Sequence, residues 1–373
     1  MNAQYACFHP KQPILYIACS NGGVLSPGDK HCLVQLGVGG DSMEPLAEPV
    51  QLPYRPLHAA IDLSEGRFAL AYNRPAAISL HALDVSGVVH KTIALHGEED
   101  LVGHFPHQVL PVPGRPEWLL TCRGDDATPD CAENPGSLRL LSGGNRSLSC
   151  ARVTAPNGGF GFGPRNSAFH PHLPVLYSIL ERQNQVAAFR HADGVLEAQP
   201  SWTVGLLQQP ERLRRPQLAG AVVIHPSGRF AYVVNRAHPA LASPDPAQLC
   251  GENSVVVLAL DTTTGEPREL QRVALPGLHA RCISLSHDGR ILIAAMRQPG
   301  CSEDVERGLI QEPAGFVCFE VQDSGHLLFL QHHAVDVGGE QLFWAEFSPP
   351  YVLDCKDQRN AGRGATRQSP GPP

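Results

Sequence analysis

The residues best suited to chemistry stand where short apolar segments begin or end. Glu181 closes the segment VLYSILE, and Arg165 stands in GPRNSAFHP just before it. His107 follows Pro106 at the start of another segment, and Arg236 closes FAYVVNR. An imidazole, with an unperturbed pKa of about 6.5, transfers protons near neutral pH. A carboxylate can act as a base or hold a cation, and guanidinium groups bind carboxylates and phosphates. Together these side chains indicate acid–base chemistry on a small anion.

A repeated hairpin is expected to bring these residues to one face of the molecule. A short strand, a turn of the Pro-x-Gly-Arg or His-Pro type and a second apolar strand recur along the chain. In an antiparallel hairpin, residues equidistant from the turn face each other. Counting from the turns pairs Arg165 with Glu181, His107 with Arg123, Arg281 with Arg297, His58 with Arg74, and Gly220 with Arg236.

These predicted pairs form a ring of cations around one carboxylate. A single arginine at a strand end is commonly solvated and inert, but recurrence of one register in five hairpins favours a binding role. Several cations around a low-dielectric mouth concentrate the electric field and attract anions. We therefore expect the ring to bind a small anionic substrate, through residues that include His58, Arg74, Arg123, Arg281 and Arg297.

The spacing of the hairpins predicts the fold. Copies return every roughly 50–60 residues, as propeller blades do. They occupy residues 5–20, 59–74, 107–123, 167–181, 221–236 and 282–297, with a weaker seventh copy at 344–356. Further strand-like runs lie between the copies, which gives about four strands per unit. We expect an all-β, seven-bladed β-propeller of four-stranded antiparallel blades, a single domain spanning residues 1–355.

The two ends of the sequence bear on the last blade. Met1 falls almost at the start of an inner strand, so the last blade could lack its outer strands and the ring could be open. Residues 356–373, KDQRNAGRGATRQSPGPP, are expected to form a disordered C-terminal tail because they offer little apolar surface to bury.

Composition excludes several functional classes. The chain has 373 residues, of which 42% are hydrophobic and 17% charged, so a sizeable core is possible. Its net charge of −7 argues against a nucleic-acid coat, and no signal peptide or membrane span is seen. The eleven cysteines are scattered without CxxC pairs, as in a reduced cytoplasmic protein. We expect a cytoplasmic monomer or weak oligomer, without metal, cofactor, nucleic-acid or membrane partner.

The sequence resembles the seven-bladed propeller lactonases, which include 6-phosphogluconolactonase and carboxymuconate-lactonising enzymes. The most specific match is GPRNSAFHP followed by VLYSILE. The resemblance covers roughly residues 1–350 and implies His107, Arg165, Glu181 and Arg236 as the active-site set. A weaker match adds Arg281 and the trailing Gln298 as substrate-binding residues.

The resemblance implies hydrolysis of a small anionic sugar lactone, most directly 6-phosphogluconolactone in the pentose phosphate pathway. Glu181 could then activate water or hold an arginine in place, while His107 transfers a proton. Arg165 and Arg236 could bind the anionic group or the oxyanion. A carboxymuconate cycloisomerase would need the same groups and stays an alternative. A non-enzymatic binding platform is a further alternative, although the mixed His, Glu and Arg set is less typical of one.

Overall fold

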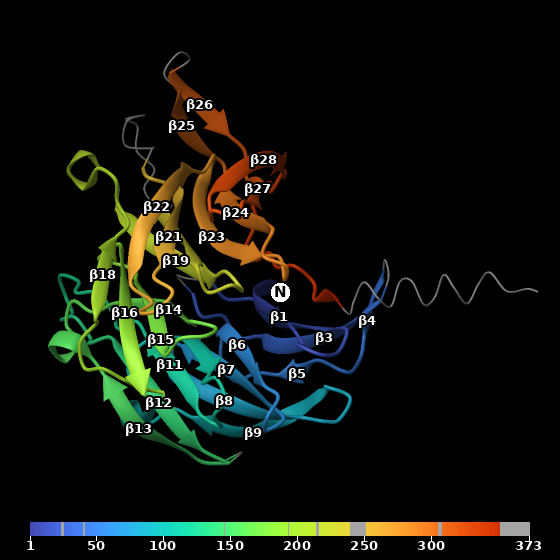
Figure 1. Ribbon diagram of the computed structural model, residues 1–373. Helices are drawn as coiled ribbons and strands as arrows, with labels where there is room; N and C mark the ends of the chain where they lie inside the picture. Colours follow the sequence, from blue (N-terminus) through green and yellow to red (C-terminus); the bar gives the residue numbers. More distant parts are fainter. Residues whose placement is uncertain are drawn as a thin grey trace, which may run out of the picture.

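A computed structural model describes residues 1–23, 26–39, 42–144, 146–192, 194–213, 216–238, 251–304 and 308–350. Strands dominate this part of the chain, and its helices are the single turn α1 (Glu99–Val102) and two 3-10 turns, η1 (Pro156–Gly159) and η2 (Pro210–Arg212). In Figure 1 the sheets surround a common centre in chain order. The prediction of an all-β propeller is therefore confirmed.

Six antiparallel sheets follow one another along the chain, and we number them as blades 1 to 6 from the N-terminus. Blade 1 contains β1 (Asn2–Phe8), β2 (Ile14–Ser20), β3 (His31–Gly39) and two short strands paired with β3, β4 (Ser42–Pro45) and β5 (Val50–Gln51). Blade 2 contains β6 (Pro56–Asp62), β7 (Arg67–Asn73), β8 (Ala76–Leu83) and β9 (Val89–His96). Blade 3 contains β10 (Pro106–Pro111), β11 (Trp118–Cys122), β12 (Ser137–Gly143) and β13 (Leu148–Thr154).

The second half of the ring repeats the pattern. Blade 4 contains β14 (Pro164–Phe169), β15 (Val175–Leu180), β16 (Gln185–Ala192), β17 (Val195–Leu196) and β18 (Trp202–Gly205). Blade 5 contains β19 (Gln217–Ile224), β20 (Phe230–Ala237), β21 (Ser254–Leu260) and β22 (Pro267–Ala274). Blade 6 contains β23 (Leu278–Leu285), β24 (Ile291–Gln298), β27 (Gly315–Val321) and β28 (Leu327–Ala334). An extra hairpin, β25 (Gly300–Asp304) and β26 (Gly308–Glu312), stands out from blade 6 in Figure 1.

The first two strands of each blade are the six clear copies of the repeat, but their pairing corrects the predicted register. Each first strand carries one extra residue, a β-bulge, near its start. Pro164, not Asn166, faces Leu180, and the bulge at Arg165 accounts for one residue of this shift. His58 faces Ala71 rather than Arg74 because this hairpin turns earlier in the chain than the count assumed. The bulges fall at Gln4, Leu57, His107, Arg165, Gly220–Ala221 and Arg281.

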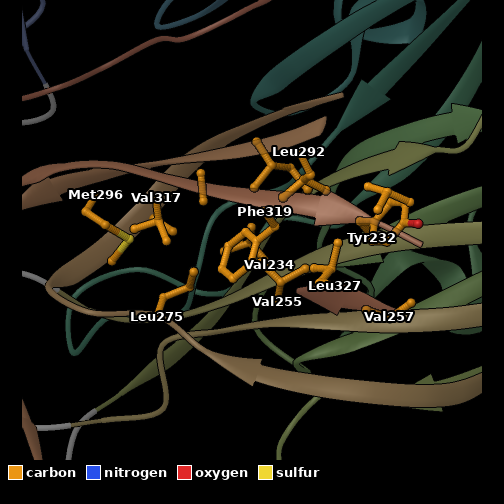
Figure 2. Close-up of a cluster of buried hydrophobic side chains, with 14 of the residues drawn as sticks. Tyr232, Val234, Val255, Val257, Leu275, Leu292, Met296, Val317, Phe319 and Leu327 are labelled. Atoms are coloured by element: carbon orange, nitrogen blue, oxygen red, sulfur yellow. The ribbon is translucent and has the colours of Figure 1, made fainter. Parts of the chain in front are cut away.

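Burial follows the position of a strand in its blade. The second strands β15 and β20 have no exposed residue, because neighbouring blades cover both of their faces. The outer strand β22, with the sequence PRELQRVA, is mostly polar and more exposed. Figure 2 shows the apolar cluster between blades 5 and 6, where Val255 packs near Met296 and Phe319. Truncating a core leucine such as Leu292 to alanine should cost about 2–5 kcal/mol.

Buried tyrosines link adjacent blades. Tyr177 Oη in blade 4 donates a hydrogen bond of 2.6 Å to the carbonyl of Gly265 in blade 5. Tyr232 of blade 5 makes the equivalent bond of 3.2 Å to Gly325 of blade 6. Each glycine has a positive φ in the turn between the third and fourth strands, a conformation that glycine adopts without strain. These bonds fix neighbouring blades around the central channel.

The seventh position contains one extended segment, residues 341–349, and no sheet among the described residues. The segment lies between blades 6 and 1: the Cys282 thiol donates to the Ala345 carbonyl at 3.1 Å, and Trp344 packs against Phe8 with ring centroids 6.2 Å apart. Six blades are thus observed where seven were expected. The weak copy at 344–356 lies only partly within the described residues, and the predicted tail lies outside them. No described helix is long and apolar enough to span a membrane.

Candidate functional site

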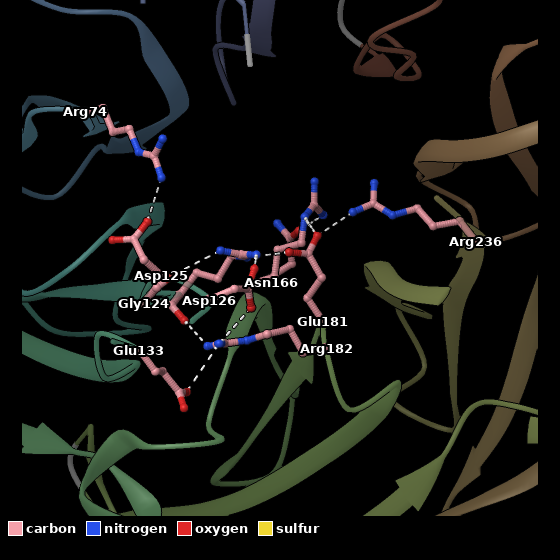
Figure 3. Close-up of polar contacts among 11 residues, drawn as sticks. Arg74, Gly124, Asp125, Asp126, Glu133, Asn166, Glu181, Arg182 and Arg236 are labelled. Atoms are coloured by element: carbon pink, nitrogen blue, oxygen red, sulfur yellow. Dashed lines mark hydrogen bonds and ion pairs between the residues drawn. The ribbon is translucent and has the colours of Figure 1, made fainter. Parts of the chain in front are cut away.

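Three arginines from three blades converge on one glutamate. Arg123 Nε lies 2.5 Å from Glu181 Oε2, while Arg165 Nε and Arg236 Nη2 lie 2.9 and 2.6 Å from Oε1. Figure 3 shows Glu181 at the centre of these contacts, with Arg236 reaching it from the neighbouring blade. Arg165 also donates to the side chain of Asn166. The expected meeting of Glu181 with Arg165 is therefore present, and Arg123 and Arg236 join it. We call these four residues the arginine cluster: Glu181, Arg123, Arg165 and Arg236.

The arginine cluster holds Glu181 in its ionised form. Burial alone would raise the pKa of this carboxyl, but the guanidinium groups of Arg165, Arg236 and Arg123 outweigh it and lower the pKa to about 2. The side chain is only 9% exposed, and both oxygens accept from guanidinium groups. A carboxylate so engaged is a weak base. The contacts therefore favour the second of its two expected roles, which is to hold arginines in place.

The loop of residues 124–136 buttresses the arginine cluster. Arg123 Nη2 contacts Asp126 at 2.5 Å, and Arg182 contacts Asp126 and Glu133 at 2.8 and 3.3 Å. Sequence reasoning missed Arg182, although it directly follows Glu181 and the loop opposite it is rich in acids. The loop therefore neutralises the outer side of the cluster and leaves the inner side positive.

A central cavity of about 680 Å³ runs along the first strands of the blades. Its wall includes four of the predicted site residues, namely His58, His107, Arg165 and Arg281. Glu181, Arg123 and Arg236 are not among the residues that line the cavity. The bulges at His107, Arg165 and Arg281 account for this arrangement, since a bulge changes the direction of a side chain. The cavity therefore presents the cationic face of the arginine cluster through Arg165.

His58 and His107 in the wall are neutral at physiological pH. Burial and the charge of Arg165 lower the pKa of His58 to about 3. Burial, followed by Arg165 and Arg281, holds the pKa of His107 well below its ordinary value of 6.5. The Nδ1 atom of each ring is buried without a hydrogen-bond partner among the described residues. Both rings therefore have a hydrogen-bonding nitrogen that no described residue engages.

Arg281 is a cation without an ion pair among the described residues. Its guanidinium lies 3.9 Å from the ring centre of Phe343, and Arg297 lies 5.1 Å from the same ring. Burial, together with Arg165, Arg236, Arg297 and Arg55, holds the pKa of Arg281 well below its ordinary value. Because like charges surround it, an anion bound here would relieve their repulsion.

Three further predicted residues, Arg74, Arg297 and Gln298, do not line this cavity. Arg74 binds Asp125 at 2.8 Å, and its side chain is 66% exposed. It therefore sits at the rim, as Figure 3 shows, rather than opposite His58. Gln298 pairs with Leu278 at the end of β24 and does not line the cavity.

The cavity also contains residues that sequence reasoning missed. Phe343 and Glu346 enter it from the extended segment in the seventh position, and Tyr5 enters from β1. The weak seventh repeat was the only signal for that segment. Among the described residues, no group of three or more His, Cys, Asp or Glu side chains could hold a metal ion.

A six-sheet propeller with a cationic central cavity is the class that the fold and site define. A model of the family "Lactonase, 7-bladed beta-propeller" matches residues 1–308, and the chain belongs to this family. The 6-phosphogluconolactonase of Bacillus subtilis (strain 168) is 31% identical over 96 residues, which are 26% of this chain and 27% of that protein. The matched stretch thus spans about a quarter of that relative.

Solved structures show the same fold. The periplasmic gluconolactonase PpgL of Pseudomonas aeruginosa has a TM-score of 0.66 and 18% identity, covering 91% of this chain and 86% of that one. A putative 6-phosphogluconolactonase from Bacteroides fragilis NCTC 9343 has a TM-score of 0.62 and 16% identity, covering 90% and 85%. At these identities the likeness concerns the fold alone.

Proposed function

We propose that the protein hydrolyses a small anionic lactone, with 6-phosphogluconolactone as the leading substrate and 6-phosphogluconate as the product. The observation that carries this proposal is the cavity wall in which Arg165, the unpaired Arg281 and two neutral imidazoles meet. Its volume suits a phosphorylated sugar. Membership of the lactonase family supports a lactone as the reacting group.

Arg165 and Arg281 are the anion-binding groups in this proposal. A lactone carbonyl becomes an oxyanion when water adds to it, and guanidinium donors in a dry site stabilise that charge. Glu181, Arg123 and Arg236 act through Arg165, because Glu181 fixes the position of its guanidinium. In this proposal Arg236 helps to position Glu181 and Arg165 and does not bind the substrate directly, since it does not line the cavity.

His107 is the general base in this proposal. Its neutral imidazole is available to take a proton from water at neutral pH. Arg165 and Arg281 are the charges that most depress its pKa after burial. A bound substrate anion would offset those charges and so raise the basicity of His107 when substrate is present.

A lactone panel tests the proposal. Wild-type protein is assayed at neutral pH with 6-phosphogluconolactone, gluconolactone and carboxymuconolactone, with product detection and correction for spontaneous hydrolysis. We expect the phosphorylated lactone to be hydrolysed with the highest kcat/KM. Formation of a lactone from carboxymuconate, without sugar lactone hydrolysis, would instead favour a cycloisomerase. No turnover of any of these compounds would favour the binding platform.

A further inference from the structure

Hydrolysis of a lactone requires a proton for the leaving alkoxide. The imidazole of His107 is neutral at the start, so it could supply a proton only after it has taken one from water. Glu181 is ionised and is not among the residues that line the cavity. This inference rests on the proposed function, and it asks which group of the cavity donates that proton.

Glu346 is the one carboxyl group among the described residues that line the central cavity. It belongs to the extended segment in the seventh position. The segment is held against β23 at two points that flank Glu346: Cys282 Sγ donates to the Ala345 carbonyl at 3.1 Å, and the Phe347 amide donates to Ser284 Oγ at 3.3 Å. These contacts fix the backbone on both sides of Glu346. Its side chain therefore shares one cavity with His107, Arg165 and Arg281.

The surroundings of Glu346 contain no cation that pairs with it. Tyr5 and Cys7 on β1 and Cys282 on β23 are the titratable groups that interact with it, and all three are neutral because their pKa values are raised. The charged and titratable groups elsewhere in the cavity wall are Arg165, Arg281, His58, His107 and His287. Glu346 makes no hydrogen bond or ion pair with a described residue, and it is an exposed residue of the cavity lining. Surrounding protein thus raises the pKa of this carboxyl to about 7.

We propose that Glu346 is the catalytic general acid that protonates the ring oxygen of the lactone as it leaves. His107 takes one proton from water, and the resulting hydroxide oxygen forms a bond to the carbonyl carbon. Arg165 and Arg281 stabilise the oxyanion. When the carbonyl reforms, the bond between the carbonyl carbon and the ring oxygen breaks, and that oxygen takes the proton of Glu346. The carboxylic acid product then ionises and returns a proton to Glu346, while His107 releases its proton to solvent.

The test compares Glu346→Gln with Glu340→Gln, a matched control just before the same segment, where the glutamate is exposed and does not line the cavity. Both variants and wild type are assayed for kcat and KM with the lactone that wild type hydrolyses, between pH 5 and 9. We expect Glu346→Gln to lower kcat by at least about a hundredfold, a usual contribution of a general acid. We also expect it to remove the alkaline limb of the pH profile, which in wild type falls through about pH 7 as Glu346 loses its proton. Glu340→Gln should change neither quantity.

Two further measurements separate proton donation from a structural role. The thiolactone analogue expels a thiolate, which is a far weaker base than an alkoxide and depends less on a proton donor. Glu346→Gln should therefore lose much less activity on the thiolactone than on the oxygen ester. Glu346→Asp, which keeps the carboxyl, should retain an alkaline limb and recover part of the rate, and it substitutes for Glu346→Gln if that variant fails to fold.

The outcomes are distinguishable. If wild type hydrolyses the lactone and Glu346→Gln keeps its rate and its alkaline limb, the assignment of Glu346 is overturned while the proposed function stands. Equal losses on the lactone and the thiolactone would likewise overturn it. If wild type hydrolyses no lactone, the proposed function fails and the assignment of Glu346 fails with it.

Discussion

Glu181 and Glu346 are the same residue type near the same channel, yet their surroundings drive them to opposite protonation states. Glu181 accepts from three guanidinium groups and has a pKa of about 2. Glu346 interacts with the neutral side chains of Tyr5, Cys7 and Cys282 and has no cationic partner among the described residues, and its pKa is about 7. At neutral pH one is a permanent anion and the other holds a proton about half the time.

In this propeller one glutamate holds arginines in position, while another glutamate is available for proton transfer. A carboxylate that accepts from three arginines can orient them. Because its oxygens are already engaged, it is a poor base toward a substrate. A carboxyl with no cationic partner can exchange protons near neutral pH. A pair of acids with separated pKa values is a common way for an active site to obtain distinct roles from one residue type.

The largest expected effect is on stability. Glu181→Ala leaves three buried guanidinium groups without their carboxylate and should lower the free energy of unfolding by about 3–5 kcal/mol. Glu346→Gln removes an acid that has no cationic partner among the described residues, and it should leave stability unchanged or higher. Urea denaturation of both variants at pH 7 measures this contrast. Equal losses for the two would remove the distinction between supporting and reactive carboxyls.

The pH dependence of stability should also differ in sign. Glu181 has a folded pKa below its ordinary value of 4.5, so its contribution is present above pH 4.5 and lost as the pH falls toward 2. Glu346 has a raised folded pKa, so ionising it weakens the fold progressively as the pH rises from about 4.5 to 7. The stability advantage of Glu346→Gln over wild type should therefore grow across that interval in urea titrations. A constant difference between pH 4 and 8 would argue against a raised pKa of Glu346.

Arg281 allows the same contrast to be tested for a cation, because we expect it to bind substrate without contributing to stability. Arg281→Met should lower kcat/KM for the anionic lactone by about 10²–10³-fold, as the loss of an oxyanion donor does. It should not lower stability, because four other arginines repel this guanidinium. Arg268→Met is the matched control, since Arg268 is exposed and paired with Glu266 on an outer strand. Steady-state kinetics and thermal melts of the two variants give both readouts, and unchanged kinetics in Arg281→Met would remove it from the substrate site.

His107 should show a moderate effect with a distinctive pH profile. His107→Gln is expected to lower kcat by about a hundredfold, as the loss of a general base does. In wild type, kcat/KM should stay level as the pH falls below 6.5, because the pKa of His107 lies well below that value and the base stays unprotonated. A steep loss of rate between pH 7 and 6 would contradict the burial of this imidazole.

The smallest expected effect is at the rim. Arg74→Met breaks an exposed pair with Asp125, and such pairs contribute about 0–1 kcal/mol. We expect kcat/KM to change by less than about fivefold in the same assay. A loss as large as that of Arg281→Met would place Arg74 in direct contact with substrate.

The sequence was sufficient for the repeat but not for local geometry. Six hairpins and the meeting of Arg165, Arg236 and Glu181 followed from recurring patterns. The bulges were not predictable because an extra residue leaves the apolar alternation of such short strands almost unchanged. Arg74 was misplaced because its partner, Asp125, comes from an irregular loop.

Glu346 escaped sequence reasoning for a different reason. Its segment lies in the weakest copy of the repeat and pairs with no neighbouring strand, so period-2 patterning gave it no distinct position. Only the packing of residues 341–349 between blades 6 and 1 brings its carboxyl into the cavity. Function-bearing residues on irregular segments are in general the ones that repeat patterns predict least well.

The opposite protonation states of Glu181 and Glu346 are the central claim, and a carboxyl titration tests them most directly. Protein labelled with ¹³C at glutamate side-chain carboxyls is titrated by NMR, and the two resonances are assigned by their loss in Glu181→Gln and Glu346→Gln. We predict that the Glu346 resonance titrates with a midpoint near pH 7, while the Glu181 resonance stays that of an ionised carboxylate down to at least pH 4. Two midpoints near the ordinary value of 4.5 would contradict the account.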